Sequence, residues 1–187
     1  MRRVACLIVA SLGLIAPAWA QVPTAGNVFF GYSFENTSSS ALNLDLSRPN
    51  LQGWQATLEG KVFPAFGIVA DFTGNYGSQN YTIYPPGGPG PLTVNVTGHQ
   101  YDVMFGPRFS VPIGNFRPFA EFEGGVGHIS TNASGSDTSL AYAFGGGLDY
   151  RLMRMVAWRF EGDYLSTRFF STSQQDVRLS TGIVIRF

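Results

Sequence analysis

The chain has 187 residues, with twelve basic and twelve acidic side chains, so its formal net charge is zero. This balance excludes the basic excess of a nucleic-acid-binding protein, and the length suits a single domain. Aromatic side chains make up 14% of the residues and glycines number 23. No segment has the apolar periodicity of an amphipathic helix, so the composition favours an exported all-β protein.

The first twenty residues have the features of a secretory signal peptide. Arg2 and Arg3 precede an apolar run over residues 4–16, and residues 18–20 form a small-x-small cleavage sequence. The run is shorter than the ~20 residues that a membrane-spanning helix needs. We therefore expect residues 1–20 to be removed and residues 21–187 to form the mature domain. Cys6 leaves with the signal, so the mature domain contains no disulfide.

Along the mature chain, segments in which apolar and polar residues alternate follow one another. Such alternation predicts β-strands, because successive side chains of a strand point to opposite faces. Eight strands are predicted, at residues 28–35, 54–62, 67–76, 98–109, 119–128, 140–151, 156–164 and 177–187.

The connections between these strands alternate in length. Those predicted at 63–66, 110–116 and 152–155 are short, and those at 36–52, 77–96, 130–137 and 168–175 are longer. The second long connection contains prolines and glycines over residues 85–91, which favours a loop. In an up-and-down meander, all short turns lie at one end and all long loops at the other. The tight turn at 152–155 also places Asp149 opposite Arg159.

The final strand, residues 177–187, has the clearest pattern. Its odd-numbered residues, which share one face of the strand, are mostly apolar and end in Phe187. Bacterial outer-membrane barrels commonly end in this way, and the chain resembles the small eight-stranded outer-membrane proteins of the OmpA/OmpX type. The resemblance implies that the barrel-assembly machinery, aided by periplasmic chaperones, reads Ile183, Ile185 and Phe187 as an assembly signal. It also implies a transmembrane β-barrel in the outer membrane of a bacterium.

Alternation alone does not decide which face of the barrel meets solvent. In a soluble lipocalin-like barrel the apolar face is inside, whereas in a membrane barrel it faces lipid. Two features favour the membrane barrel. The apolar parity carries aromatic residues suited to a girdle at the membrane interfaces: Trp54, Tyr76, Tyr101, Tyr150, Trp158 and Tyr164. The opposite parity carries charges of both signs, which we predict to form a network in the lumen: Glu59, Lys61, Asp71, Asp102, Arg108, Glu121, Glu123, Asp149, Arg151, Arg159, Glu161, Asp163, Arg178 and Arg186.

Candidate catalytic and metal sites are weak. His128 and Ser130 resemble the His-x-Ser pair of a family of outer-membrane lipid A deacylases, but the nearest downstream acid is Asp137, in a predicted loop. His99 and His128 have no second ligand at a metal-site spacing. The Glu121/Glu123 pair fits a lumen charge better than a glycosidase site. We predict no catalytic residue, metal or cofactor.

These observations predict a non-catalytic, integral outer-membrane barrel with a charged, largely filled lumen and long extracellular loops. Its expected roles are structural, adhesive or in surface contact, with outer-membrane lipid around it and an extracellular ligand at the loops. We expect a monomer that binds no nucleic acid. The alternatives are a narrow pore or transporter of a small apolar solute and, less favoured, a lipid A-modifying enzyme.

Overall fold

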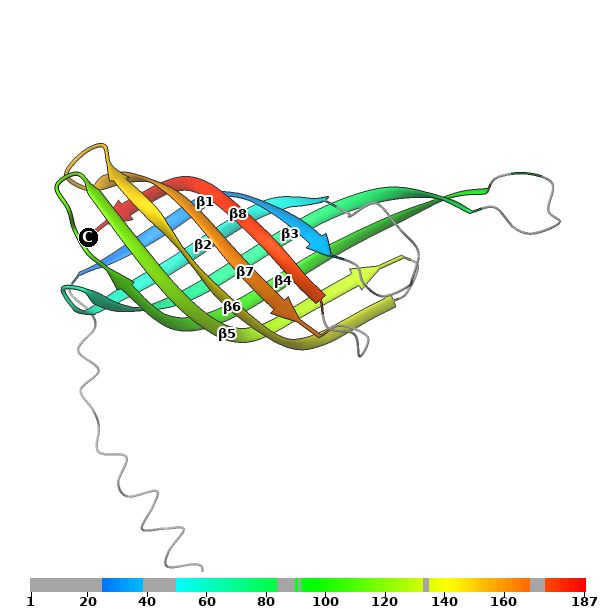
Figure 1. Cartoon of the computed structure of the whole chain (residues 1–187), viewed down its shortest axis with the longest axis horizontal. Helices are drawn as coiled ribbons and strands as arrows, with labels where there is room; N and C mark the ends of the chain where they lie inside the picture. Colours follow the sequence, from blue (N-terminus) through cyan, green and yellow to red (C-terminus); the bar gives the residue numbers. More distant parts are fainter. Residues whose placement is uncertain (1–24, 39–49, 84–89, 91, 133–134, 169–173) are drawn as a thin grey trace, which may run out of the picture.

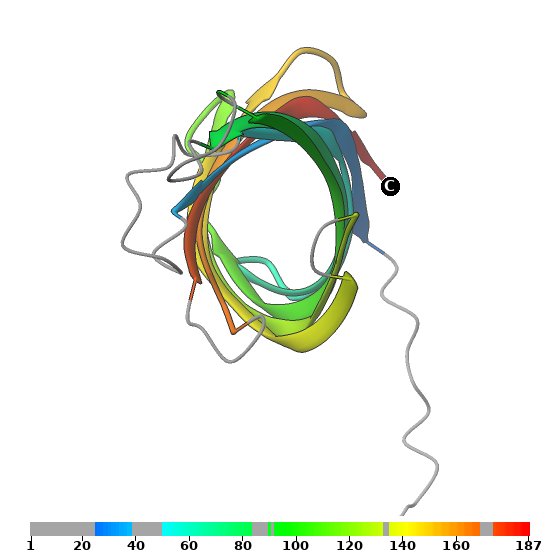
Figure 2. The same cartoon turned by 90° about the vertical axis from the view of Figure 1, so that its right-hand side faces the viewer.

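The chain folds into a closed barrel of eight antiparallel strands (Figures 1 and 2). The computed structural model describes residues 25–38, 50–83, 90, 92–132, 135–168 and 174–187. Each strand pairs with its neighbours in chain order, and the last strand closes the ring on the first. The predicted all-β, up-and-down architecture is therefore confirmed. The predicted signal at residues 1–20 lies outside the described residues.

Among the described residues, no helix has the length and apolar character needed to cross a membrane.

All eight strands occupy the predicted places, and each is longer than predicted. In order they are β1 (Gly26–Ser38), β2 (Asn50–Phe63), β3 (Phe66–Ile83), β4 (Leu92–Ser110), β5 (Phe116–Thr131), β6 (Gly135–Arg151), β7 (Val156–Thr167) and β8 (Gln174–Arg186).

Backbone bonds between β1 and β8 close the barrel up to the last residue. The Gly26 N–H donates to the Phe187 carbonyl at 3.0 Å, and the Phe187 N–H donates back to the Gly26 carbonyl at 3.1 Å. The terminal residue therefore takes part in the closing ladder.

Two connections predicted as loops are largely strand. The predicted loop over residues 77–96 is instead a β-ribbon, in which β3 and β4 stay paired from Gly77 opposite Gly98 to Ile83 opposite Leu92. The prolines and glycines that predicted a loop are confined to residues 85–91, while the flanking residues alternate and retain their N–H donors. In Figure 1, β3 and β4 run on beyond the other strands.

The connection between β5 and β6 is also shorter than predicted. Strand β5 continues to Thr131 and β6 begins at Gly135, within the predicted loop 130–137. Gly135 has φ 81°, a left-handed conformation that glycine adopts without steric cost.

The barrel is apolar outside and polar inside, the reverse of a soluble protein. Outward side chains such as Phe30, Phe144 and Phe160 are more than half exposed. The interior is filled mainly by polar and charged side chains, with two small apolar clusters among them. One consists of Phe29, Ala157 and Val184, and the other of Met104, Ala141, Ala143 and Leu165.

Candidate functional site: a charged network inside the barrel

The lumen holds a dense network of buried charges. Its described part contains four buried arginines, Arg108, Arg117, Arg159 and Arg178, and ten buried acids: Glu35, Glu59, Asp71, Asp102, Glu121, Glu123, Asp149, Glu161, Asp163 and Asp176. Strand alternation brings these residues together, because each has the inward parity of its strand.

Near the short-turn end, one ion pair joins neighbouring strands and a second crosses the ring. Arg159 Nε lies 2.7 Å from Asp149 Oδ1, and its Nη2 lies 3.2 Å from Asp149 Oδ2. The two residues are opposite one another in the β6–β7 register, as predicted. Arg117 Nη2 donates to Glu59 Oε1 at 2.7 Å, across from β5 to β2.

In the middle of the lumen, Arg108 connects three strands. Its Nε donates to Glu121 Oε2 at 2.6 Å on the adjacent β5, and its Nη2 reaches Glu161 Oε2 at 3.3 Å on β7. The Gln55 amide on β2 donates to Glu161 Oε1 at 2.7 Å. These contacts cross the interior rather than following one wall.

Arg178 forms a second bridge across the lumen. It donates from Nη2 to Asp163 Oδ2 on β7 at 2.8 Å, and the same nitrogen lies 2.8 Å from Asp71 Oδ2 on β3. Its Nη1 donates to Thr73 Oγ1 at 2.8 Å. One guanidinium therefore links β3, β7 and β8.

Aromatic rings support two of the arginines. The Arg108 and Arg159 guanidinium carbons lie 4.4 and 4.5 Å from the centroid of Phe119, and Arg159 lies 5.1 Å from that of Phe29. A cation above an aromatic face is attracted by the ring quadrupole. Phe119 thus holds both guanidinium groups in place between their carboxylates.

Beyond Arg178, amides surround the buried acids. Glu35 Oε2 accepts a hydrogen bond from Asn75 Nδ2 at 2.5 Å, and Gln100 Nε2 donates to Asp102 Oδ2 at 3.0 Å. Gln100 is also 3.4 Å from Glu35 Oε1. This part of the lumen is therefore polar and acidic, with neutral donors.

Sequence reasoning missed three buried members of the network. Glu35, Arg117 and Asp176 were not included, although their burial equals that of the predicted residues. Each has the inward parity of its strand, so the alternation could have identified them.

One predicted member is wrong, and two lie at the margin. Arg151 is exposed, and its Nη2 donates to the Gly114 carbonyl at 2.8 Å and to Asn115 Oδ1 at 3.1 Å. It is the last residue of β6, where the lumen wall ends, so its side chain reaches the neighbouring turn. Lys61 and Arg186 are half-buried, and Arg186 lies 3.7 Å from Asp149.

The six predicted girdle aromatics all lie on the outer surface. Their exposed fractions run from 36% for Trp54 to 47% for Tyr164. Tyr150 and Trp158 face one another beside the β6–β7 turn. Tyr76 and Tyr101 lie further along β3 and β4, with their hydroxyl oxygens 3.0 Å apart.

The His128/Ser130 pair does not form a nucleophile with its base. His128 is exposed on the outer surface, and its Nδ1 lies 2.7 Å from Thr138 Oγ1 on β6. The described part of the chain shows no hydrogen bond between His128 and Ser130, so these two residues lack the geometry that activates a serine.

Comparison with known proteins places the chain among bacterial surface barrels. The family model "Outer membrane protein beta-barrel domain" matches residues 6–187. No curated protein matches the chain.

Solved structures share the fold at low sequence identity. Neisserial surface protein A (NspA) has a TM-score of 0.66 at 14% identity, over 87% of this chain and 99% of that one. The attachment invasion locus protein Ail of Yersinia pestis has a TM-score of 0.57 at 14% identity, over 87% of this chain and 98% of that one.

Proposed function

The chain belongs to the outer membrane protein beta-barrel domain family and is located in the bacterial outer membrane, and we propose that it acts there as a non-catalytic barrel that contacts molecules outside the cell. The contact is made through the ribbon formed by residues 77–83 of β3 and 92–98 of β4.

The main support for this proposal is the extension of β3 and β4 as a paired ribbon. At about 3.3 Å per residue, its seven paired positions extend roughly 20 Å. Strand β3 pairs with β2 only as far as Tyr76, and β4 pairs with β5 only from Gly98 onward. Within the described residues, the β3 edge of the ribbon therefore offers backbone groups to another molecule. The base of the β4 edge is covered, because Asn132 bonds to the backbone of Asn95 and Thr97.

The composition of the ribbon supports the same role. Residues 77–98 include no charged side chain. Natural proteins commonly protect exposed strand edges with charges, which hinder pairing with another strand. An uncharged edge that projects from the barrel is suited to binding an extended segment of a partner protein by strand addition.

A charge on the ribbon is expected to reduce attachment. Asn80 is exposed and hydrogen-bonds to Asn95 on the opposite strand. A lysine at this position repels an incoming strand, so Asn80→Lys should lower attachment of bacteria carrying the protein to bacterial and animal-cell surfaces. Replacing residues 78–97 by Asn-Gly should lower it further, because this turn closes a hairpin without the ribbon.

Ser136→Lys provides the matched control. Ser136 is an exposed residue of β6. It pairs with Ser130 on β5, in the hairpin that follows the ribbon. This variant should attach like the native protein. Equal attachment of all variants, at equal amounts of heat-modifiable barrel, would contradict a contact role for the ribbon.

Deletion of Phe187 is expected to lower the amount of folded protein in the outer membrane. The deletion removes the terminal aromatic residue of the proposed assembly signal together with two backbone bonds to Gly26. The measurement is the heat-modifiable band in outer-membrane fractions. Phe187→Tyr keeps both the bonds and an aromatic ring and should assemble normally. Unchanged levels after deletion would exclude Phe187 from the signal.

The second candidate function is handling of a small apolar solute. A groove of about 590 Å³ lies on the outer wall over β1, β6, β7 and β8, lined by Tyr32, Phe34, Phe160 and Leu179 around Gly162. Because these side chains point away from the lumen, the groove favours lateral binding of an apolar molecule rather than passage through the barrel.

A further inference from the structure

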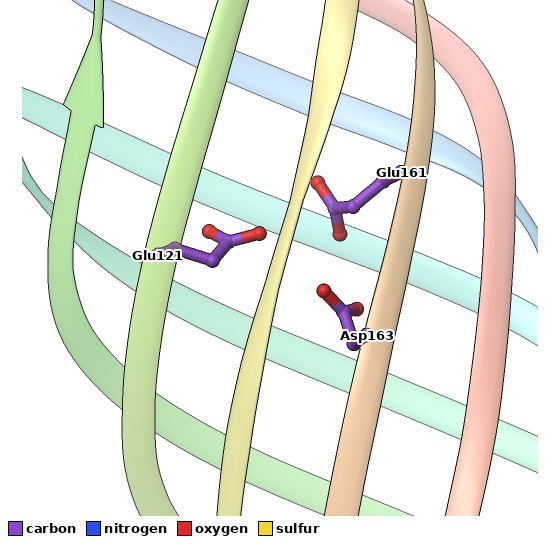
Figure 3. Close-up of side chains that lie close together, drawn as sticks. All are labelled: Glu121, Glu161 and Asp163. Atoms are coloured by element: carbon purple, nitrogen blue, oxygen red, sulfur yellow. The ribbon is translucent and has the colours of Figure 1, made fainter.

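Three carboxylates converge inside the barrel without touching a common cation. Glu121 on β5 and Glu161 and Asp163 on β7 each contribute an oxygen, and these oxygens all lie within 4.8 Å of one another. All three side chains are buried. Figure 3 shows them pointing toward one another across β6.

A glycine leaves the space between them. In the β5–β6–β7 register, Gly145 stands between Glu121 and Asp163. A Cβ at Gly145 would come within 1.9 Å of Asp163 Oδ1. A larger residue here would displace the carboxylate from the cluster.

The arginines satisfy only one side of these carboxylates. Arg108 contacts Glu121 Oε2 and Glu161 Oε2, and Arg178 contacts Asp163 Oδ2. Glu121 Oε1 and Asp163 Oδ1 are fully buried and have no hydrogen-bond partner. A buried oxygen without a donor or cation is costly, which points to a ligand at this side of the cluster.

A glutamine amide reaches the cluster from the opposite wall. Gln55 on β2 is 1% exposed, and its Nε2 lies 2.7 Å from Glu161 Oε1. The amide therefore reaches the cluster with its nitrogen. A half-turn of the amide exchanges this nitrogen for Oε1, which is buried without a partner.

Buried acids outnumber buried bases in the described part of the lumen. The ten buried acids exceed the four buried arginines, and adding the half-buried Lys61 and Arg186 still leaves four more acids than bases among the described residues. A buried charge without a counter-charge is strongly disfavoured. One divalent cation would cancel two of the four.

We propose that Glu121, Glu161, Asp163 and the amide oxygen of Gln55 bind one divalent cation of the Ca²⁺ class inside the barrel. All four ligands are oxygens, which suits a hard cation rather than zinc or copper. Ca²⁺ accepts irregular geometry at 2.3–2.6 Å, whereas Mg²⁺ requires a near-ideal octahedron. The bound ion joins β2, β5 and β7 through the middle of the lumen.

Calcium binding can be measured on the whole folded protein. The barrel is unfolded in the presence of EDTA, which removes bound metal. It is then refolded in detergent with or without CaCl₂, desalted and analysed for metal. We expect one retained Ca²⁺ per barrel and a higher midpoint temperature of the heat-modifiable gel shift. MgCl₂ at the same concentration should give a smaller rise, and NaCl at equal ionic strength should give none.

Substitutions at single carboxylates test where the ion binds. Glu121→Gln and Asp163→Asn keep the side-chain size and should weaken Ca²⁺ binding at least tenfold. Asp102→Asn, which changes a buried lumen carboxylate outside the cluster, should retain one ion. If the native barrel binds no Ca²⁺ and gains stability only on acidification, protons neutralise the cluster and the proposal is wrong. Ca²⁺ retained equally by all variants would place the ion elsewhere and would also overturn it.

Discussion

Asp149→Ala is expected to lower the free energy of unfolding by about 3 kcal/mol, measured by urea titration of the barrel in lipid vesicles. Removing one partner of a buried ion pair typically costs about 3–5 kcal/mol, because the other charge stays buried without compensation. The lower value applies here, because Arg159 keeps a contact of 3.4 Å to Glu161 and its position over Phe119.

A double-mutant cycle separates the ion pair from packing. Arg159→Met retains the apolar stem beside Phe119 while removing the charge, and an alanine would leave a cavity there. Added to Asp149→Ala, this change should cost much less than it does alone, because no unpaired cation remains. We expect a coupling energy above about 1.5 kcal/mol, within the range for contacting residues.

Arg151→Ala is the matched control, since Arg151 has the same inward parity and lies two residues from Asp149. Its side chain is exposed and bonds to the turn between β4 and β5. Exposed substitutions away from special features usually change stability by less than about 0.5 kcal/mol. Purely additive losses for Asp149 and Arg159, or a large loss for Arg151, would contradict the arrangement of the network.

The alternation of side chains between the two faces of a strand explains why so much of the barrel could be predicted. Inward and outward faces follow from a period of two, and a tight turn at 152–155 was sufficient to place Asp149 opposite Arg159. Parity does not say how far along the lumen a residue lies. Arg151 therefore was placed in the network although it lies at the rim.

Contacts across the lumen could not be predicted from the sequence. Gln55 meets Glu161, and Arg178 meets Asp71, only because the strands tilt and the register is staggered around the ring. Tilt and stagger are properties of the closed barrel and have no local sequence signal. The length of β3 and β4 was missed for a different reason. The glycines and prolines of residues 85–91 were taken to mark the whole connection, whereas β3 continues to Ile83 and β4 begins at Leu92.

The folded barrel is expected to show no large, stable conductance step in planar bilayers. Eight strands enclose a space that side chains can fill, whereas water-filled porins use 16–18 strands. Here the filling is specific. Arg117 on β5 reaches Glu59 on β2, Arg108 on β4 reaches Glu161 on β7, and Arg178 on β8 reaches Asp71 on β3.

These three contacts each span the ring between strands that are not neighbours, so they obstruct the lumen in successive layers. An ion that moves through must separate buried pairs, each of which costs several kcal/mol to break. Apolar clusters around Phe29 and around Met104 fill further parts of the lumen. Arg108→Ser and Arg178→Ser remove two of the bridging side chains together, so the double variant should show more frequent small openings than the native barrel.

A 16-stranded porin reconstituted in the same bilayers provides the positive control, and heat-modifiable mobility verifies that each sample is folded. Brief or small openings of the native protein agree with a filled lumen, because thermal motion can separate single pairs transiently. A sustained, porin-sized current from a verified monomer would require a continuous water path past Arg108 and Arg178. That result would contradict the bridging contacts and make transport through the lumen the leading function.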